Sequence, residues 1–503
     1  MRGVGAGVLG TLALLATGLP AQEPGHAFLD RIATPPLRFT PPDVRERQLA
    51  GGVTVFFLQD SSLPLVDVFA RFRGGYGRFP RELHAAGTAL PHLLRTGGTR
   101  EMTPDSVERV VERYALQLSV GGSGSAVTAS LNTLAEHLPA ALEFWGAMLG
   151  RPRFDTARVA VWRGQEGESV RRRLDDPARL AFAEFNRLLY GDHPVGWEMT
   201  EEDLDPARLT VERFRWLHER IVCPDNLVLG VAGDVRWEEL RPLLERMVEA
   251  LPPCAEPLPP PPTARVGAPA GVYLLPRPVN QSTVVLAHPV RLAQDTSRAY
   301  FASRVGNTIL GAGGFSSRLL TRVRTREGLA YGASSLWTTP REYDGLLGAT
   351  TRTRSEATVR TIRLVLETMA EMALEPPTAD EVGTVVDETV NGWVFNFGSP
   401  AQIVSRHMAF RAAGLPDDWL EAYLRGLRAV TPEDVRSVFA DHLRPEDMVI
   451  LVVGDPEAMD SGLEALGPVR ILGPDGGPRG GRPPAGGPSA ATPPPSAGPR
   501  SPR

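Results

Sequence analysis

The sequence contains no lysine, so all 54 of its basic residues are arginine. We attribute this absence to a GC-rich genome that avoids AT-rich lysine codons, and not to selection for arginine chemistry. The formal net charge is only -5, which argues against the basic surface that nucleic-acid binding requires. Beyond the first residues, no stretch approaches the ~20 apolar residues of a membrane-spanning helix.

Cysteine and histidine are also scarce. Only Cys223 and Cys254 are present, and neither has the spacing of a zinc or redox motif. An oxidising compartment would permit them to pair, but the sequence does not reveal their geometry, so both states stay open. None of the nine histidines has another three or four residues away. This excludes a helix that presents two histidine ligands one turn apart.

The two ends of the chain differ from the rest in composition. Arg2, an apolar stretch at 8–15 and a small-residue segment ending at Ala21 have the order of a secretory signal peptide, which we place at 1–21. No cysteine follows directly to carry a lipid. We therefore expect an exported protein, soluble in the periplasm. Residues 473–503 are nearly all Gly, Pro, Ala, Ser and Arg, and we expect a disordered, solvated tail there.

The chain contains an internal duplication. Residues 209–235 align without a gap with residues 430–456. Thr210 and Thr431 each stand where a helix N-cap belongs, and each repeat then reads as helix, turn and buried strand. Because 503 residues are too many for one core, the duplication predicts two homologous domains.

The hydrophobic pattern predicts the same layout in both halves. In the first half we expect helices after Thr103 and over most of 134–150, 157–191 and 210–222, with strands at 53–58, 65–69, 116–120, 127–131 and 227–232. The second half restarts with strands at 272–275 and 283–287 and a helix at 298–311. This indicates an α+β fold: two homologous domains of antiparallel or mixed sheet, each with helices packed on one face. We place them at 40–250 and 271–470, joined by a Pro-rich linker at 251–270.

Several motifs resemble the insulinase or pitrilysin-type zinc metallopeptidases. The most specific is the run from Gly311 to Leu320 followed by the segment from Val323 to Tyr331, which is similar to a signature of that family's second domain. The turn at 94–99 and the duplicated closing unit agree with it. The likeness covers about residues 40–460.

That resemblance implies two domains that face each other as half of a clamshell, often completed by a second chain. It also implies a zinc ion held by an inverted HxxEH helix and a downstream Glu. Here the sequence departs from the family, because the segment from His84 to His92 has no Glu and contains Pro91, which we expect to disrupt a helix. The downstream candidates Glu166 and Glu168 have no histidine pair to join. We therefore interpret His84 and His92 as surface or packing residues and expect no metal in this chain.

The second half retains more of the family pattern. In the family, an Arg and a Tyr seven residues apart project into the chamber, and they correspond to Arg324 and Tyr331. Arg offers a fixed fork of donors to peptide carbonyls, and a Tyr hydroxyl can donate to an oxyanion. The alternative for both is a surface Arg and a Tyr packed at a strand start.

The glycine-rich run has two interpretations. Gly311, Ala312, Gly313 and Gly314 could let a substrate backbone approach closely, or the glycines could end the preceding helix. The serines that follow, at 316 and 317, are candidate helix caps.

These patterns predict a non-catalytic subunit of an exported two-chain metallopeptidase. Arg324 and Tyr331 would complete the active site of a homologous, zinc-bearing partner that hydrolyses peptides. The alternative is a catalytically inert binding or scaffold protein of the same fold.

Overall fold

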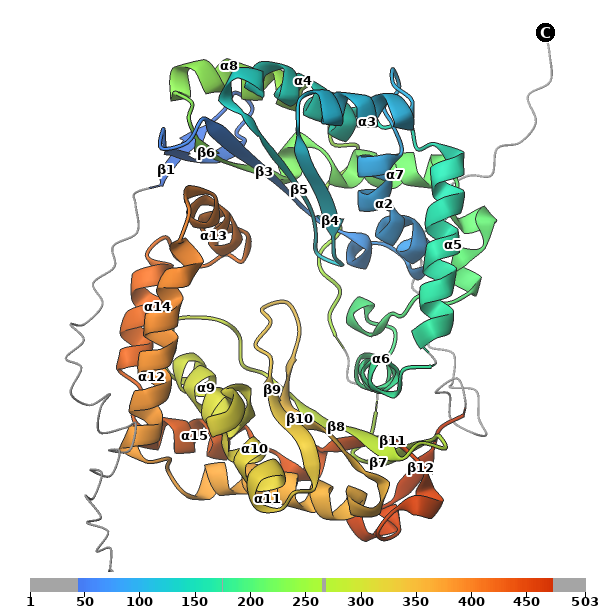
Figure 1. Ribbon diagram of the computed structural model, residues 1–503, viewed down its shortest axis with the longest axis vertical. Helices are drawn as coiled ribbons and strands as arrows, with labels where there is room; N and C mark the ends of the chain where they lie inside the picture. The colour runs from blue at the N-terminus through green and yellow to red at the C-terminus, as the bar shows by residue number, and fades with distance from the viewer. Residues whose placement is uncertain (1–43, 174, 265–267, 474–503) are drawn as a thin grey trace, which may run out of the picture. The chain divides into compact units, whose positions relative to one another are not determined.

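The computed structural model describes residues 44–173, 175–264 and 268–473 (Figure 1). The predicted signal peptide and all but the first residue of the predicted tail lie outside these ranges. None of the described helices combines the length and the apolar character that crossing a membrane demands.

The chain forms two six-stranded sheets. Their strand orders are β1-β2-β6-β3-β5-β4 and β12-β7-β11-β8-β10-β9. The strands of the first sheet are β1 (Arg45–Gln48), β2 (Thr54–Gln59), β3 (Leu65–Arg73), β4 (Gln117–Gly122), β5 (Ala126–Leu134) and β6 (Leu227–Gly233). Those of the second are β7 (Gly271–Pro276), β8 (Gln281–Val290), β9 (Ala330–Trp337), β10 (Gly345–Arg354), β11 (Val449–Gly454) and β12 (Val469–Ile471).

Five strands of each sheet are equivalent, which agrees with the duplication read from the sequence. β2 runs parallel to β6, as β7 runs parallel to β11, and the next three strands are antiparallel in both sheets. The sixth strands differ, because β1 is antiparallel to β2 whereas β12 is parallel to β7. The α+β fold with two mixed sheets is thus confirmed.

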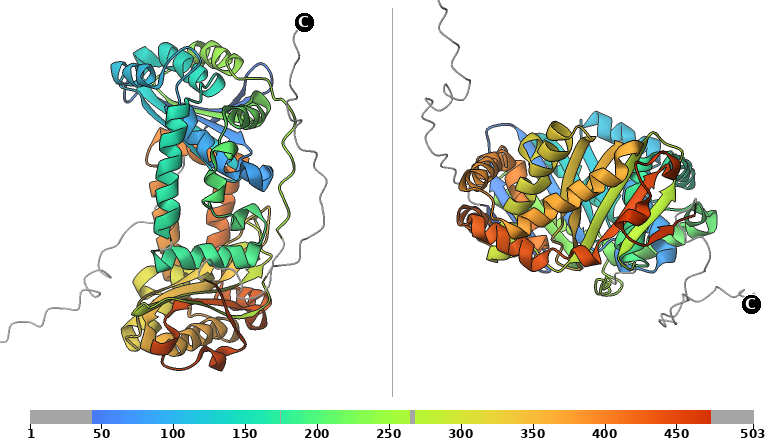
Figure 2. Two further views of the ribbon diagram at one scale, coloured as in Figure 1. Left: turned by 90° about the vertical axis from the view of Figure 1, so that its right-hand side faces the viewer. Right: turned by 90° about the horizontal axis from the view of Figure 1, so that it is seen from below.

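Most helices of each half form a hydrophobic core with one face of that half's own sheet (Figures 1 and 2). The larger helices of the first half are α2 (His84–Thr96), α3 (Pro104–Arg113), α4 (Leu138–Gly150), α5 (Thr156–Arg173), α6 (Pro177–Tyr190), α7 (Val211–Ile221) and α8 (Trp237–Glu249). The α-helices of the second half are α9 (Arg298–Asn307), the three-residue α10 (Arg318–Leu320), α11 (Thr358–Leu374), α12 (Ala379–Trp393), α13 (Pro400–Ala412), α14 (Trp419–Arg428) and α15 (Pro432–His442).

Local capping explains several helix starts. Thr210 accepts a hydrogen bond from the backbone N–H of Arg213, and Thr431 accepts one from that of Asp434, so both predicted N-caps of the repeat are confirmed. Two helices, α5 and α6, fill most of the stretch 157–191, where helices were expected. Asp176 caps a new helix there, and Pro177 takes its first position, where the missing N–H costs nothing.

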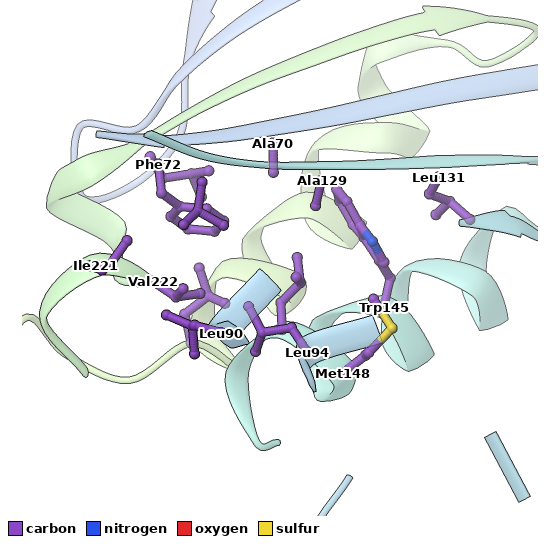
Figure 3. Close-up of a cluster of buried hydrophobic side chains, with 14 of the residues drawn as sticks. Ala70, Phe72, Leu90, Leu94, Ala129, Leu131, Trp145, Met148, Ile221 and Val222 are labelled. Atoms are coloured by element: carbon purple, nitrogen blue, oxygen red, sulfur yellow. The ribbon is translucent and has the colours of Figure 1, made fainter. Parts of the chain in front are cut away.

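The core of the first half lies between the sheet and its helices (Figure 3). Phe72 and Ala129 on the strands point towards Leu90 and Leu94 of α2. Trp145 of α4 is fully buried beside them. These apolar contacts hold α2 against the face of the first sheet.

One helix of each half packs on the sheet of the other. α6 belongs to the first half of the chain, yet its buried residue Phe185 shares a cluster with Leu275 and Val285 of the second sheet. In return, Val404 and Met408 of α13 pack with Phe56 of the first sheet. These contacts cover apolar strand positions that the helices of the same half do not reach.

Cys223 and Cys254 form a disulfide, which resolves the question the sequence left open. The bond joins the end of α7 to the segment after α8 and closes a loop with a sequence separation of 31. We expect the Cys223→Ser, Cys254→Ser double variant to lose roughly 2–4 kcal/mol of unfolding free energy, because its unfolded chain is less constrained. Urea unfolding would measure this, and reduced wild type should match the variant. Equal midpoints for oxidised and reduced wild type would contradict the expectation.

Candidate functional site

Arg324 and Tyr331 lie together in the second half. Arg324 is in a wide helical turn, η10 (Thr321–Arg326), and Tyr331 is the second residue of β9. The guanidinium carbon of Arg324 is 4.7 Å from the ring centre of Tyr331, a cation–π distance. The structure therefore places side by side the two residues that the sequence selected.

A β-bulge directs the Tyr331 side chain. Arg352 of β10 pairs with Gly332 and the next residue, Thr353, pairs with Ala330, so Tyr331 is the extra residue of β9. Bulges of this kind re-aim a side chain and are common beside functional sites. Tyr331 is 83% exposed, so its hydroxyl is accessible to a ligand. The alternative of a Tyr packed at a strand start is wrong.

Phe315 is a third member of this cluster that the sequence analysis did not single out. Its ring centre is 5.1 Å from the guanidinium carbon of Arg324, and the side chain is 78% exposed. The signal available in the sequence was a large aromatic residue inside a run of glycine and serine. The contact of Phe315 with Arg324 could not be read from the sequence, because it depends on how the chain turns between these two positions.

The arginines around this cluster differ in their partners. Arg318 makes two 2.8 Å hydrogen bonds to Glu381, and these bonds lower the pKa of that carboxyl to about 2. Arg322 pairs with Glu371 at 2.5 Å. Within the described ranges, the Arg324 guanidinium has no ion-pair or hydrogen-bond partner, only the two rings.

The glycine-rich run has a backbone role. A Cβ added to Gly311 would lie 2.3 Å from the backbone nitrogen of Ser335, so this glycine lets the turn η8 (Thr308–Ala312) touch β9. Gly313 ends η8 by donating its N–H to the carbonyl of Thr308, and Gly314 has a positive φ of 71° with open space around it. The helix expected to reach residue 311 thus becomes a wide turn after Asn307. Substrate contact by residues 311–314 stays a prediction.

Ser317 occupies the N-cap position of α10, but its side chain makes no capping bond. The hydroxyl instead donates to the carbonyl of Gly314 at 2.7 Å. The prediction that a serine precedes this helix is therefore confirmed, but the prediction that its side chain caps the helix is wrong for Ser317.

The segment that should carry the metal in the first half is helix α2. The helix continues through Pro91, so the expected disruption is wrong. Pro91 is buried and packs closely against Gly122 of β4, where an added Cβ would lie 2.5 Å from the proline ring. His84 and Thr88 both belong to α2 and lie one turn apart, which is the spacing of the two histidines in the HxxEH motif.

His84 is a packing residue. It is 4% exposed and contacts the rings of Tyr76 and Trp197 edge-on. Burial, and then the charge of Arg81, lower the pKa of His84 to about 4, so the imidazole is neutral at pH 7. Its Nδ1 lies 2.9 Å from Nη1 of Arg81, which leaves that nitrogen as an acceptor.

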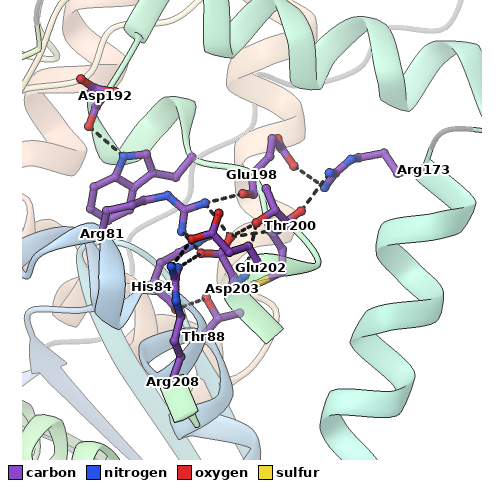
Figure 4. Close-up of polar contacts among 12 residues, drawn as sticks. Arg81, His84, Thr88, Arg173, Asp192, Glu198, Thr200, Glu202, Asp203 and Arg208 are labelled. Atoms are coloured by element: carbon purple, nitrogen blue, oxygen red, sulfur yellow. Dashed lines mark hydrogen bonds and ion pairs between the residues drawn. The ribbon is translucent and has the colours of Figure 1, made fainter. Parts of the chain in front are cut away.

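A buried ion-pair network supports this region (Figure 4). Arg81 donates two 2.7 Å hydrogen bonds to Asp203, which also accepts from Arg208 and from the backbone and hydroxyl of Thr200. Asp203 is only 3% exposed. The network fixes Arg81 beside His84, so a positive charge occupies the neighbourhood where a cation would have to bind.

These residues do not fit a zinc ion. His84, Thr88 and Glu166 line one cavity of about 350 Å³, but Thr88 uses its hydroxyl to donate to the carbonyl of His84. Glu168, the other downstream candidate, pairs with Arg171 instead. Among the described residues, no group of three or more His, Cys, Asp or Glu could hold a metal ion. One histidine and one carboxylate fall short of the three protein ligands of a catalytic zinc site.

Position 87 excludes the general base of the motif. A Cβ added to Gly87 would lie 2.6 Å from Cβ and 3.1 Å from Cα of Tyr76. We expect Gly87→Ala to destabilise the protein by about 1–2 kcal/mol, because overpacking outweighs the gain in helix propensity. Gly164→Ala in α5 is the matched control, since nothing lies within 4 Å of its added methyl group, and it should be neutral or stabilising. Equal unfolding midpoints for the two variants would contradict this account.

Comparison with known proteins agrees with these features. Residues 208–388 match the family model described as "Peptidase M16 inactive domain". The chain is 28% identical to an uncharacterized zinc protease of Streptomyces coelicolor over 389 residues, which covers 75% of this chain and 82% of that protein. It is 21% identical over 282 residues to YmxG of Helicobacter pylori, named a non-peptidase homolog, covering 56% of this chain and 63% of YmxG.

Solved structures show the same fold. A peptidase M16 inactive domain from Pseudomonas fluorescens superimposes with a TM-score of 0.73 at 25% identity, covering 82% of this chain and 98% of that chain. The periplasmic protease PqqL from Escherichia coli gives a TM-score of 0.70 at 14% identity, over 83% of this chain and 46% of PqqL. The second likeness concerns the fold alone.

Proposed function

Because the chain is a homologue of the insulinase-like M16 peptidases, we propose that it is the non-catalytic subunit of an exported two-chain peptidase. The observation that carries this proposal is an asymmetry between the two halves. Arg324 and Tyr331 form an exposed cluster in the second half, whereas α2 in the first half has Gly87 and Thr88 where HxxEH requires Glu and His.

The two residues have distinct roles in the proposed complex. Arg324 binds an oxygen of the peptide through its N–H groups, because no residue within the described ranges occupies them. The hydroxyl of Tyr331 donates a hydrogen bond to the oxyanion that forms as the peptide bond is attacked. A homologous partner supplies the zinc ion and the general base, because the described residues of this chain offer no metal-ligand cluster and α2 has Gly87 where the motif has Glu.

Two features support export. The first 21 residues have the pattern of a signal peptide, and the disulfide between Cys223 and Cys254 is of a kind that persists in an oxidising compartment. We therefore place the complex in the periplasm.

The test is reconstitution with a homologue that has an intact HxxEH helix. Peptide hydrolysis is measured for each chain alone and for the co-purified pair. We expect turnover from the pair that far exceeds the sum of the separate chains. Equal activity of the partner with and without this chain would refute the proposal, as would hydrolysis and stoichiometric zinc in this chain alone.

A second candidate is an inert binding or scaffold protein of the same fold. The observation in its favour is the relative YmxG, which is named a non-peptidase homolog. This alternative predicts that the pair forms, or that peptides bind, with no effect of Tyr331 on any turnover.

A further inference from the structure

The surroundings of Arg324 hold a feature that the proposed function does not explain. Two large rings, Phe315 and Tyr331, are 78% and 83% exposed within a few ångströms of one guanidinium. Exposed aromatic side chains of this size normally fold back onto an apolar surface, because leaving them in water is unfavourable. Here each ring is instead within cation–π range of Arg324.

The charge of Arg324 is also uncompensated. Two neighbouring arginines have a carboxylate partner: Arg318 of α10 pairs with Glu381, and Arg322 of η10 pairs with Glu371. Arg324 is half-buried, and within the described ranges it has no such partner. A partly desolvated guanidinium without an acid is a site for an anionic ligand, because charge-assisted hydrogen bonds gain strength when water is excluded.

The hydrogen-bonding geometry of a guanidinium indicates which chemical group the ligand carries. The guanidinium carbon of Arg324 lies over both rings, and no residue within the described ranges occupies its N–H groups, so these remain available to an acceptor on a ligand. A carboxylate presents two oxygens that match two parallel N–H groups, whereas a peptide carbonyl presents one. An aromatic–arginine cluster therefore favours a carboxylate over a neutral amide.

We propose that Phe315 and Tyr331 form an aromatic clamp that holds Arg324 so that its N–H groups bind a carboxylate of the bound peptide. The carboxylate is either the C-terminus of the peptide or an acidic side chain. Phe315 is a positioning residue in this arrangement, because it acts through Arg324. The inference rests on the proposed function, since it specifies which peptides that site prefers.

The test measures binding to the purified full chain without a partner subunit. The probes are three fluorescein-labelled versions of one short unstructured peptide: a free C-terminus, an amidated C-terminus, and an amidated C-terminus with one internal Glu. We expect the free acid or the Glu peptide to bind about ten-fold more tightly than the neutral amide, the gain of one charge-assisted hydrogen-bond pair. Which of the two binds more tightly identifies the source of the carboxylate.

Variants separate the clamp from general charge. Arg324→Gln should abolish the preference, and Phe315→Ala and Phe315→Leu should each reduce it about two- to five-fold, because neither replacement has a π face. Phe315→Trp should restore it. Arg326→Gln is the matched control for the loss of one positive charge. Phe395→Ala is the control for the loss of an exposed ring, because Phe395 is 80% exposed. Both control variants should still bind the carboxylate peptides more tightly than the neutral amide.

Equal affinity for all three peptides, or no binding by any of them, would overturn the inference. So would an unchanged preference in Phe315→Ala, or its loss in Arg326→Gln. None of these results affects the reconstitution test, which measures turnover of the pair with any peptide. The failure of the clamp and the failure of the subunit role are therefore distinguishable.

Discussion

Tyr331→Phe is expected to lower the turnover of the reconstituted pair by about 10²–10³-fold, the loss seen when one oxyanion donor is removed. The substitution deletes only the hydroxyl. Tyr331 is the extra residue of a bulge and is mostly exposed, so neither the sheet nor the core depends on its oxygen. The fall should appear in kcat more than in KM, because the hydrogen bond to an oxyanion forms in the transition state.

Tyr114→Phe provides the matched control for this measurement. Tyr114 follows α3 in the first half, and its ring contacts His137, far along the chain from the site. Turnover of the Tyr114→Phe pair should equal that of the wild type. Wild-type turnover in the Tyr331→Phe pair would favour the inert scaffold over the subunit role.

Asp203→Ala is expected to have the largest effect on stability, a loss of about 3–5 kcal/mol of unfolding free energy. The carboxylate is buried and accepts hydrogen bonds from Arg81, Arg208 and Thr200. Removing it leaves Arg81 with no ion-pair partner among the described residues beside neutral His84, whereas Arg208 keeps Glu202. Because both arginines keep some contact with water, we expect the lower end of the range. Urea unfolding at pH 7 would measure it.

Asp203 should also make part of the protein's stability sensitive to acid. Burial alone would raise the pKa of Asp203, but the hydrogen bonds from Arg81 and Thr200 outweigh it and the pKa is lowered. The stabilisation that the Asp203 carboxylate gives to the folded state is therefore complete above the pKa of an unfolded Asp, about 3.9. It is lost as the pH falls through the lower pKa of Asp203 in the folded protein. Asp203→Asn should unfold with less pH dependence than the wild type below about pH 4. Parallel pH profiles for the two proteins would contradict this assignment.

Local signals in the sequence were sufficient for much of the fold. The N-cap threonines, the alternation of the hairpin strands and the gapless repeat each depend on neighbours within a few positions, so they survive whatever the rest of the chain does. Pro91 shows the limit of such signals. A proline inside a helix is unfavourable by itself, but α2 continues through Pro91, which packs closely against Gly122, and no local rule contains that contact.

Some residues of the candidate site could likewise be predicted from the sequence, whereas others could not. Arg324 and Tyr331 could be selected because their spacing matches a family motif. Phe315 could not, since its contact with Arg324 follows from the wide turns η8 and η10, whose geometry depends on Gly311 lying against β9. The cavity at His84 was likewise invisible, because it requires residues more than a hundred positions apart.

From the sequence alone, this protein is a duplicated α+β chain that lacks the paired histidines found in the metal helix of the peptidases it resembles. Composition, periodicity and motif spacing are sufficient for this, because they are properties of the chain itself. Only the tertiary structure decided that Cys223 and Cys254 pair, that α6 and α13 each pack on the opposite sheet, and that two exposed rings flank Arg324. The reason is physical: these contacts join segments distant in sequence, and their free energy exists only once the chain has brought those segments together.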